Sequence, residues 1–414
     1  MIFAVNHPRF AERQALVADG LALALVASVP LSTSATAILA VAWLIGVIPT
    51  LRRGDGGVVR AHAALWLPLL LVALGVAGMF WADVAWIERW KGLDSFLKLA
   101  AIPLLMLQFR RSDRAMLALW VYLGACAVVL ALSALFYAVP SLYWRDIGTF
   151  PAPFKNNSTQ SGEFVACIFI LLSLAAIAWQ RGSRWLAAGA VVLAAWCLHN
   201  IVFAGTARTP LVVAPVLLLA LLVRMRRPGI AVLSVATAGV IAAGLWTASP
   251  YLRQRTTDIW TEIQRYREKG ELTSSGERLE FWKKSLESIA TGPVAGHGTG
   301  SIPEQFRIHT VGQTGPYATV TPNPHQQTFA VAIQLGILGV LALWAMWIAH
   351  ALLFRGPGFA AWVGLLAVIQ NVVGSLFNSH LFDFTQGWTY VIGVGIAGGA
   401  VLKPRDRASR ETTP

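Results

Sequence analysis

Apolar runs recur along almost the whole chain, and each is close to the roughly 20 residues that an α-helix needs to cross a bilayer. Short polar segments separate the runs, and Lys and Arg gather in these segments. The pattern predicts twelve spans, approximately at 16–31, 36–51, 62–80, 95–108, 115–139, 163–180, 185–203, 209–223, 229–248, 326–353, 358–377 and 385–402. We therefore expect an all-α, polytopic membrane protein of about twelve transmembrane helices.

The connections between the predicted spans alternate in charge. One set holds 18 Lys and Arg: Arg9, Arg13, Arg52, Arg53, Arg60, Arg110, Arg111, Arg114, Arg181, Arg184, Arg224, Arg226, Arg227, Arg355, Lys403, Arg405, Arg407 and Arg410. The opposite short connections hold only five: Arg89, Lys91, Arg145, Lys155 and Arg208. Because basic residues favour the cytoplasmic side, both termini are predicted to be cytoplasmic.

The longest polar segment follows the ninth predicted span and falls on the outer side. The predicted organisation is 1–248 for spans one to nine, 249–325 for a large outer loop with two helices, 326–402 for spans ten to twelve and 403–414 for a cytoplasmic tail. In the loop, Ile259, Ile263 and Tyr266 recur at helical spacing. A second helix is predicted by the capping-box spacing from Ser274 to Glu277. From Thr291 to Pro324 Gly and Pro dominate, which predicts a mobile loop.

Composition supports the membrane interpretation and excludes other classes. Hydrophobic residues make up 56% of the chain and charged residues only 13%, whereas soluble domains are about a quarter charged. The net charge of +13 is scattered over short connections, so it indicates topology and not a nucleic-acid partner. Cys126, Cys167 and Cys197 lie in apolar runs without short spacing, so neither a zinc site nor a disulfide framework is predicted.

The first apolar run is predicted to remain as a span. The start of the chain lacks the short basic region of a cleaved signal, although residues 35–37 loosely resemble a cleavage site. In the last span, small residues are suited to close helix packing in lipid, namely Gly393, Gly395, Gly398 and Gly399.

Three basic residues on the predicted outer side are the main candidates for chemistry. Arg208 lies in a turn so short that its charge stays at the membrane boundary, where it either binds a partner or reaches lipid headgroups. Arg278 lies in the first turn of the second loop helix, where the helix dipole disfavours a cation, so an anionic ligand or a pairing with Glu277 or Glu280 is expected. His325 precedes the tenth span, where a neutral imidazole can accept a proton; a structural role is the alternative.

Several other outer residues are weaker candidates for substrate binding. Arg145 and Lys155 are placed to extend an anion site, or are simply solvated. His297 lies in the Gly-His-Gly-Thr-Gly run at 296–300, which either cradles a phosphate or forms a turn. The last outer turn carries Asn378, His380 and Asp383.

These residues together resemble the O-antigen ligase and polymerase superfamily of bacterial inner membranes, most closely its ligases. The resemblance rests on the Arg208 turn, the Ser-Gly-Glu-Arg-Leu run at 275–279 with Trp282, and Gly-Pro at 292–293 leading to 296–298. It continues with Asn-Pro-His-Gln-Gln at 323–327 and Gly-Ile-Leu-Gly at 336–339. Thr209 follows Arg208 where many relatives have Gly, and Gln326 follows His325 where many have Asn.

The resemblance implies a fold similar to lipid-linked glycosyltransferases of the GT-C type and a specific reaction. The implied donor is a glycan on undecaprenyl pyrophosphate, and the implied acceptor is a sugar of the lipid A core. Arg208 and Arg278 are then expected to bind the pyrophosphate, and His325 to deprotonate the acceptor, with inversion and without a covalent intermediate. Metal-dependent lipid-linked glycosyltransferases commonly place acidic metal ligands in their first outer loop. The first outer turn of this chain, 31–35, carries no carboxylate, so no metal or other cofactor is expected.

Other functions fit the same features. An O-antigen polymerase uses the same donor, and a protein O-oligosaccharyltransferase transfers to Ser or Thr. A lipid or glycan exporter is a different class, but the span centres carry almost no acidic residues for a proton relay. Membrane lipid is an expected partner in every case, and nucleic acid in none.

Overall fold

The computed structural model describes residues 8–204, 209–225, 250–269 and 273–404, with a few isolated residues between 239 and 247, and every regular element in these ranges is helical. The first half contains α1 (Pro8–Leu31), α2 (Thr33–Val47), α3 (Asp55–Ala61), α4 (Ala63–Gly78), α5 (Trp86–Leu97), α6 (Ala101–Phe109), α7 (Ala115–Ala138), α8 (Asn157–Gln180), α9 (Arg184–His199) and α10 (Thr209–Met225). The second half contains α12 (Pro250–Lys269), α13 (Ser274–Thr291), α14 (Ile302–Ile308), α15 (Gln327–Leu353), α16 (Phe359–Gly374) and α17 (Phe384–Leu402).

The described helices confirm an all-α, polytopic membrane protein. Seven of them are long and apolar enough to cross a bilayer, and an eighth results if the α3 and α4 pair, bent by 90°, is one span. Two shorter apolar helices are Thr209–Arg224 and Phe359–Gly374. Each predicted span coincides with a described helix except the ninth, 229–248, which lies outside the described residues.

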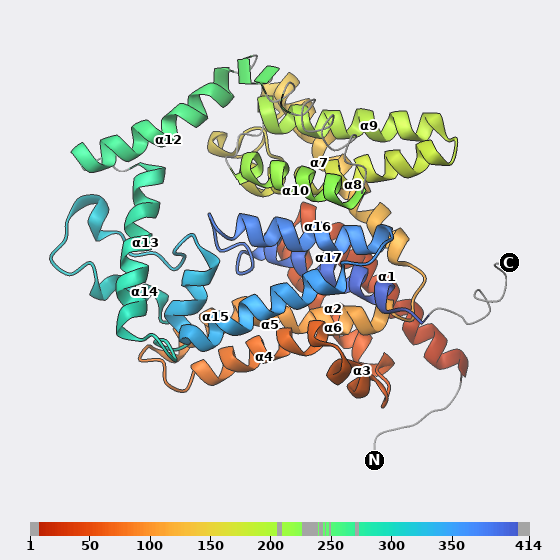
Figure 1. Cartoon of the computed structure of the whole chain (residues 1–414), viewed down its shortest axis with the longest axis horizontal. Coiled ribbons are helices and arrows are strands. Elements are labelled where there is room, and N and C mark those ends of the chain that lie inside the picture. The colour runs from red at the N-terminus through yellow and green to blue at the C-terminus, as the bar shows by residue number, and fades with distance from the viewer. Residues whose placement is uncertain are drawn as a thin grey trace.

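The helices run side by side, so the bundle has two ends. In Figure 1, α4, α15, α16 and α17 cross the view together, with α13 and α14 at one end and α3 with the first turn of α1 at the other. Glycines bring α17 against α6, as predicted, because a Cβ at Gly399 would lie 2.7 Å from the Met106 carbonyl oxygen.

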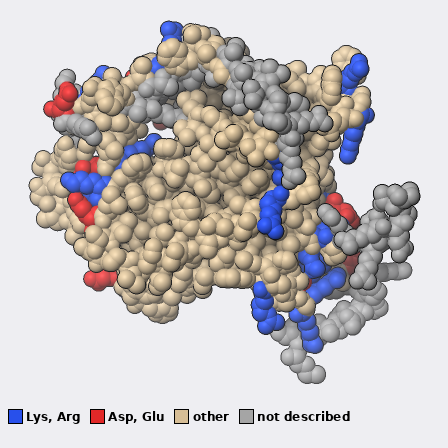
Figure 2. Space-filling model, in the orientation of Figure 1, with Lys and Arg blue, Asp and Glu red and all other residues tan. Residues whose placement is uncertain are grey.

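Basic side chains gather at the end opposite α13. Figure 2 shows Lys and Arg concentrated around α3 and at the turn between α8 and α9, with a broad band of uncharged surface across the middle. The exposed basic residues of these two regions are Arg52, Arg53, Arg60, Arg181 and Arg184. These turns belong to the set that the charge alternation places on one side of the membrane.

The segment predicted as a mobile loop, 291–324, is more regular than the sequence indicated. It contains α14 and a docked stretch whose backbone N–H groups of His297, Gly298 and Thr299 donate to the carbonyls of Ile333, Gln334 and Gly78. The acceptor carbonyls of α15 lie next to a kink at Gly336, which has a φ of +58°. Backbone groups hold this stretch in place, so no pattern of side chains along the sequence predicts that it is ordered.

The two loop helices form where predicted, with a shifted cap. Thr273, and not Ser274, caps α13 by accepting a hydrogen bond from the Gly276 N–H at 3.1 Å. A Cβ at Gly276 would lie 2.4 Å from Tyr266, so glycine lets α12 and α13 cross closely. The Tyr266 hydroxyl then donates to Glu280 Oε2 at 2.8 Å, which fixes α13 against α12.

Candidate active site

Helix α13 is anchored on the start of α15 and carries Arg278 to that end of the bundle. A small apolar cluster joins the two helices to α14; its buried members are Phe281, Ile302, Phe306, Ala330 and Ile333. The buried Lys284 ammonium donates to the Tyr317 carbonyl and lies 3.7 Å from Glu280 Oε1. Arg278 and Phe281 are one turn apart and therefore share a face of α13.

His325 is held in an uncommon backbone conformation directly before α15. Among the described non-glycine residues, only His325 has a positive φ, at +54°. Its backbone N–H donates to Asn323 Oδ1 at 2.9 Å. Its ring stacks on Phe281, with ring centroids 5.9 Å apart and an angle of 13° between the planes. Such conformations cluster at functional sites, where the surroundings enforce them.

A chain of hydrogen bonds fixes which nitrogen of His325 carries the proton. His325 Nδ1 lies 2.8 Å from Asn378 Oδ1, and the Asn378 Nδ2 group donates to Asp383 Oδ2, also at 2.8 Å. Because Asn378 uses its amide NH₂ on the carboxylate, its oxygen faces the ring and can only accept. Nδ1 is therefore the protonated nitrogen, and Nε2 has a lone pair that accepts no hydrogen bond from the described residues.

The turn that carries Asn378 and Asp383 is clamped from two sides. Gln327, in the first turn of α15, accepts hydrogen bonds at its Oε1 from the backbone N–H groups of Leu381 and Phe382 at 3.0 and 3.1 Å. From the other side, Lys98 Nζ donates to the carbonyls of Phe382 and Asp383 at 2.9 and 3.0 Å. These contacts fix the distance between the turn and His325.

Burial and charge keep the His325 imidazole neutral. Burial lowers the pKa of His325 below its usual 6.5, the hydrogen bond to Asn378 opposes this, and the Arg278 guanidinium lowers it further. Burial raises the pKa of Asp383 to about 6, while the nearby Lys98 charge opposes the rise. At neutral pH the cluster therefore holds a neutral imidazole, a carboxylate and a guanidinium.

Of the three main candidates, the structure brings Arg278 and His325 together. Arg278 also lies within electrostatic range of His380: burial, together with the Arg278 guanidinium, lowers the pKa of His380 to about 4. Arg208 lies outside the described residues. The first described residue after it, Thr209, lines a small cavity of about 10 Å³ together with His380, so the start of α10 lies at the same end of the bundle.

The weaker candidates divide between local structure and the His325 cluster. Arg145 Nη1 donates to the carbonyls of Lys155 and Ala152, at 2.5 and 3.2 Å, so its guanidinium braces its own connection. Burial lowers the pKa of Lys155, and its Nζ makes no hydrogen bond within the described part of the chain. Asp383 belongs to the His325 cluster through Asn378.

The run at 296–300 is a docking segment and not a free phosphate cradle. His297 Nε2 lies 2.8 Å from the Ser288 carbonyl oxygen and closes the end of α13. The backbone N–H groups of residues 297–299 donate to carbonyls, and that of Gly300 donates to Gln334 Oε1 at 2.8 Å. With these donors already engaged, none is left for a phosphate.

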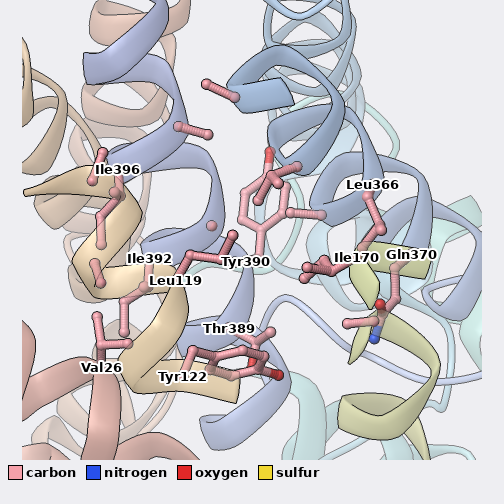
Figure 3. A pocket seen from close by; sticks show the side chains of 18 of the residues that line it. Val26, Leu119, Tyr122, Ile170, Leu366, Gln370, Thr389, Tyr390, Ile392 and Ile396 are labelled. Carbon is pink, nitrogen blue, oxygen red and sulfur yellow. The ribbon is translucent and has the colours of Figure 1, made fainter. Parts of the chain in front are cut away.

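A separate apolar hollow of about 170 Å³ lies among α1, α7, α8, α16 and α17. Figure 3 shows its lining, in which Val26, Leu119, Ile170, Leu366 and Ile392 surround Tyr390. Neither His325 nor Arg278 lines it, so it is not the place for proton transfer. In the described part of the chain, no group of three His, Cys, Asp or Glu side chains is arranged to hold a metal ion.

The fold and the cluster together define a multi-pass helical membrane protein with an oriented, neutral histidine and an arginine at one end. Residues 193–344 match the family described as O-antigen ligase, which confirms the resemblance: the chain carries an O-antigen ligase family domain, a domain found in ligases and polymerases that act on glycans. The matched range includes Arg278 and His325 and ends before Asn378. No curated protein matches the chain.

Proposed function

We propose that this protein is an O-antigen ligase, which transfers a glycan from undecaprenyl pyrophosphate to a sugar of the lipid A core. The reaction takes place on the periplasmic face of the bacterial inner membrane, in a fold of the GT-C type. One observation carries the proposal: Asn378 holds the His325 ring with Nδ1 protonated and Nε2 free, in the electrostatic range of Arg278. The family match supports a reaction on glycans.

The two arginines have the charge and shape to bind the leaving group of this reaction. When the bond between the sugar and the pyrophosphate breaks, the lipid pyrophosphate gains one negative charge. A guanidinium binds phosphate oxygens in a bidentate manner and stays charged at every accessible pH. We propose that Arg278 and Arg208 bind and neutralise the pyrophosphate.

His325 has the properties needed to activate the acceptor hydroxyl. In the proposed step, Nε2 takes the proton of the acceptor hydroxyl while that oxygen attacks the anomeric carbon. The new bond forms on the face opposite the departing pyrophosphate, so the configuration inverts, and no covalent enzyme intermediate is formed. A base whose pKa lies near or below the working pH is unprotonated and ready to accept.

The direct test is transfer by the purified protein in detergent or nanodiscs, with a defined lipid-pyrophosphate glycan and a lipid A-core acceptor. We expect product with inverted anomeric configuration, and an unchanged rate after EDTA treatment, because guanidinium groups supply the countercharge to the pyrophosphate. A strict requirement for Mg²⁺ would refute the metal-free mechanism. Absence of product with active donor and acceptor would refute the function.

Removal of the Asn378 side chain tests how His325 is oriented. Asn378→Ala deletes the acceptor that holds Nδ1–H, so we expect kcat to fall roughly 10- to 100-fold, by analogy with other groups that orient catalytic or metal-bound histidines. Since the Asn378 hydrogen bond raises the pKa of His325, the acid limb of the pH profile should move to lower pH. Asn157→Ala is the control away from the cluster, because it removes an amide side chain whose Nδ2 group donates to the Phe150 carbonyl at 3.0 Å. Equal effects of the two variants would show that Asn378 acts only on the fold.

Two functions with the same donor remain as alternatives, and a null strain separates them. A ligase null leaves long glycan chains on the lipid carrier and uncapped core. A polymerase null instead leaves single repeat units on the core, and a protein O-oligosaccharyltransferase null loses glycan from proteins. A lipid or glycan exporter belongs to a different functional class and gives no transfer product in the assay with purified protein.

A further inference from the structure

A polar cavity of about 240 Å³ lies beside the His325 cluster. One wall is a single face of α5, formed by Glu88, Lys91, Gly92 and Ser95, which follow helical spacing. The turn that carries Ser379 and Asp383 also lines the cavity, as does Asn323. Asn323 and Asp383 each make a hydrogen bond within the His325 cluster.

Close backbone contacts give the cavity a fixed shape. A Cβ at Gly92 would lie 2.4 Å from the Gly300 nitrogen, so α5 and the docked segment touch where both line the cavity. Gln334 lines the cavity and uses its Oε1 on the Gly300 N–H at 2.8 Å. The space is large enough for several water molecules, so it is not a packing defect.

One residue of the lining, Ser379, has a buried hydroxyl that the described part of the protein leaves without a partner. Ser379 is only 2% exposed, and its Oγ has no hydrogen-bond partner among the described residues. Asp383 uses Oδ2 on Asn378, and Oδ1 accepts no hydrogen bond in the described part of the chain. A buried polar group without a partner is costly, and Ser379 and Asp383 both belong to the cavity lining, so their unused oxygens point to a ligand that supplies the missing hydrogen bonds.

The charges of the lining decide between an anion and a neutral ligand. Two carboxylates, Glu88 and Asp383, line the cavity with one cation, Lys91. Lys91 lies 2.8 Å from Glu88 and its side chain is 65% exposed, so it is paired at the surface. Arg278 is not among the lining residues. A phosphate is therefore repelled here, whereas a neutral polyol can donate to the carboxylate and exchange hydrogen bonds with the hydroxyls.

We propose that this cavity binds one neutral sugar residue of a glycan substrate, with Ser379 and Asp383 as its hydrogen-bonding partners. Whether that glycan is the donor or the acceptor rests on the proposed function. The proposal that the cavity binds sugar hydroxyls does not depend on it. The Asp383 carboxylate both lines the cavity and holds Asn378, so a bound sugar lies one side chain away from the group that orients His325.

Ser379→Ala tests the proposal with little risk to folding, because the deleted hydroxyl makes no hydrogen bond within the described part of the chain. We expect the KM for one glycan substrate to rise about 5- to 10-fold, the size of one lost hydrogen bond, with kcat little changed. A rise for the acceptor or for the donor tells which glycan supplies the sugar. Ser375→Ala is the matched control, since Ser375 Oγ is also buried without a partner but does not line the cavity. Unchanged KM values for both substrates with Ser379→Ala would overturn the proposal.

A binding measurement separates this proposal from the proposed function. Ser95→Leu fills the cavity from α5, and free core oligosaccharide and free repeat-unit oligosaccharide serve as lipid-free probes. We expect one probe to bind the wild-type protein and to bind Ser95→Leu at least tenfold more weakly. Binding that Ser95→Leu leaves unchanged, or no binding of either probe by wild type, overturns the sugar site. If wild type binds a probe but transfers no glycan, the function fails and the site stands.

Discussion

Replacement of His325 by Asn is expected to lower kcat for glycan transfer by about 10²- to 10⁴-fold, the range that a positioned general base contributes. Asn has no basic nitrogen, so the acceptor hydroxyl must lose its proton to water. The measurement is steady-state transfer by the purified variant at saturating donor and acceptor. Thermal unfolding of the same sample reports on the fold.

Asn is a better substitute than Ala at this position because of the backbone. The φ of +54° at His325 is tolerated by Asn more readily than by most residues, so His325→Asn removes the base with the least added strain. His309→Ala is the matched control: His309 belongs to the same loop, and its Nδ1 lies 3.5 Å from Glu287, away from the cluster. A His325→Asn variant that folds and transfers at near the wild-type rate would remove His325 from the mechanism.

The pH profile follows from the same cluster. Burial and Arg278 lower the pKa of His325 below 6.5, so the base is free at neutral pH. As the pH falls through this lowered pKa, Nε2 takes a proton and kcat/KM drops. Asp383, with a pKa of about 6, also protonates on the acid side of neutral pH. Both groups place the loss of activity on the acid side.

The sequence predicts the membrane fold and singles out His325, because both leave local signals. Apolar runs of membrane-spanning length need no partner elsewhere in the chain to be recognised. His325 stands in a short polar run before an apolar one, and the structure explains that run residue by residue. Asn323 accepts from the His325 N–H, Gln326 caps α15 by accepting from Phe329 N at 2.6 Å, and Gln327 clamps the turn at 378–383.

The partners of His325 are much harder to predict. Asn378 follows the histidine by 53 residues, and no periodicity links them. Lys98 lies within an apolar run of a different helix, yet it reaches the Phe382 carbonyl, 284 residues further along the chain. Such pairings depend on how whole helices pack. The turn at 378–383 is only a weak candidate from the sequence for the same reason, since the contacts of its polar residues form only when the turn packs beside α15.

Replacement of Arg278 by Gln is expected to lower kcat/KM for the lipid-pyrophosphate donor by about 10²- to 10³-fold, as for other single donors to a developing negative charge. Gln is neutral and cannot compensate the charge that the leaving pyrophosphate gains. A second consequence follows for the base: Arg278 lowers the pKa of His325, so its removal should raise that pKa and move the acid limb to higher pH. Transfer at several pH values measures both effects in one variant.

Two further variants separate the charge of Arg278 from its shape. Arg278→Lys keeps the positive charge but loses the planar fork that matches phosphate, so the acid limb should stay near its wild-type position while the rate recovers only in part. Lys283→Gln is the matched control, because Lys283 is an exposed cation on the same helix and its loss removes charge without touching the cluster. If Lys283→Gln slows transfer as much as Arg278→Gln, general attraction of the anionic donor to α13 explains the effect, and a specific pyrophosphate contact at Arg278 does not.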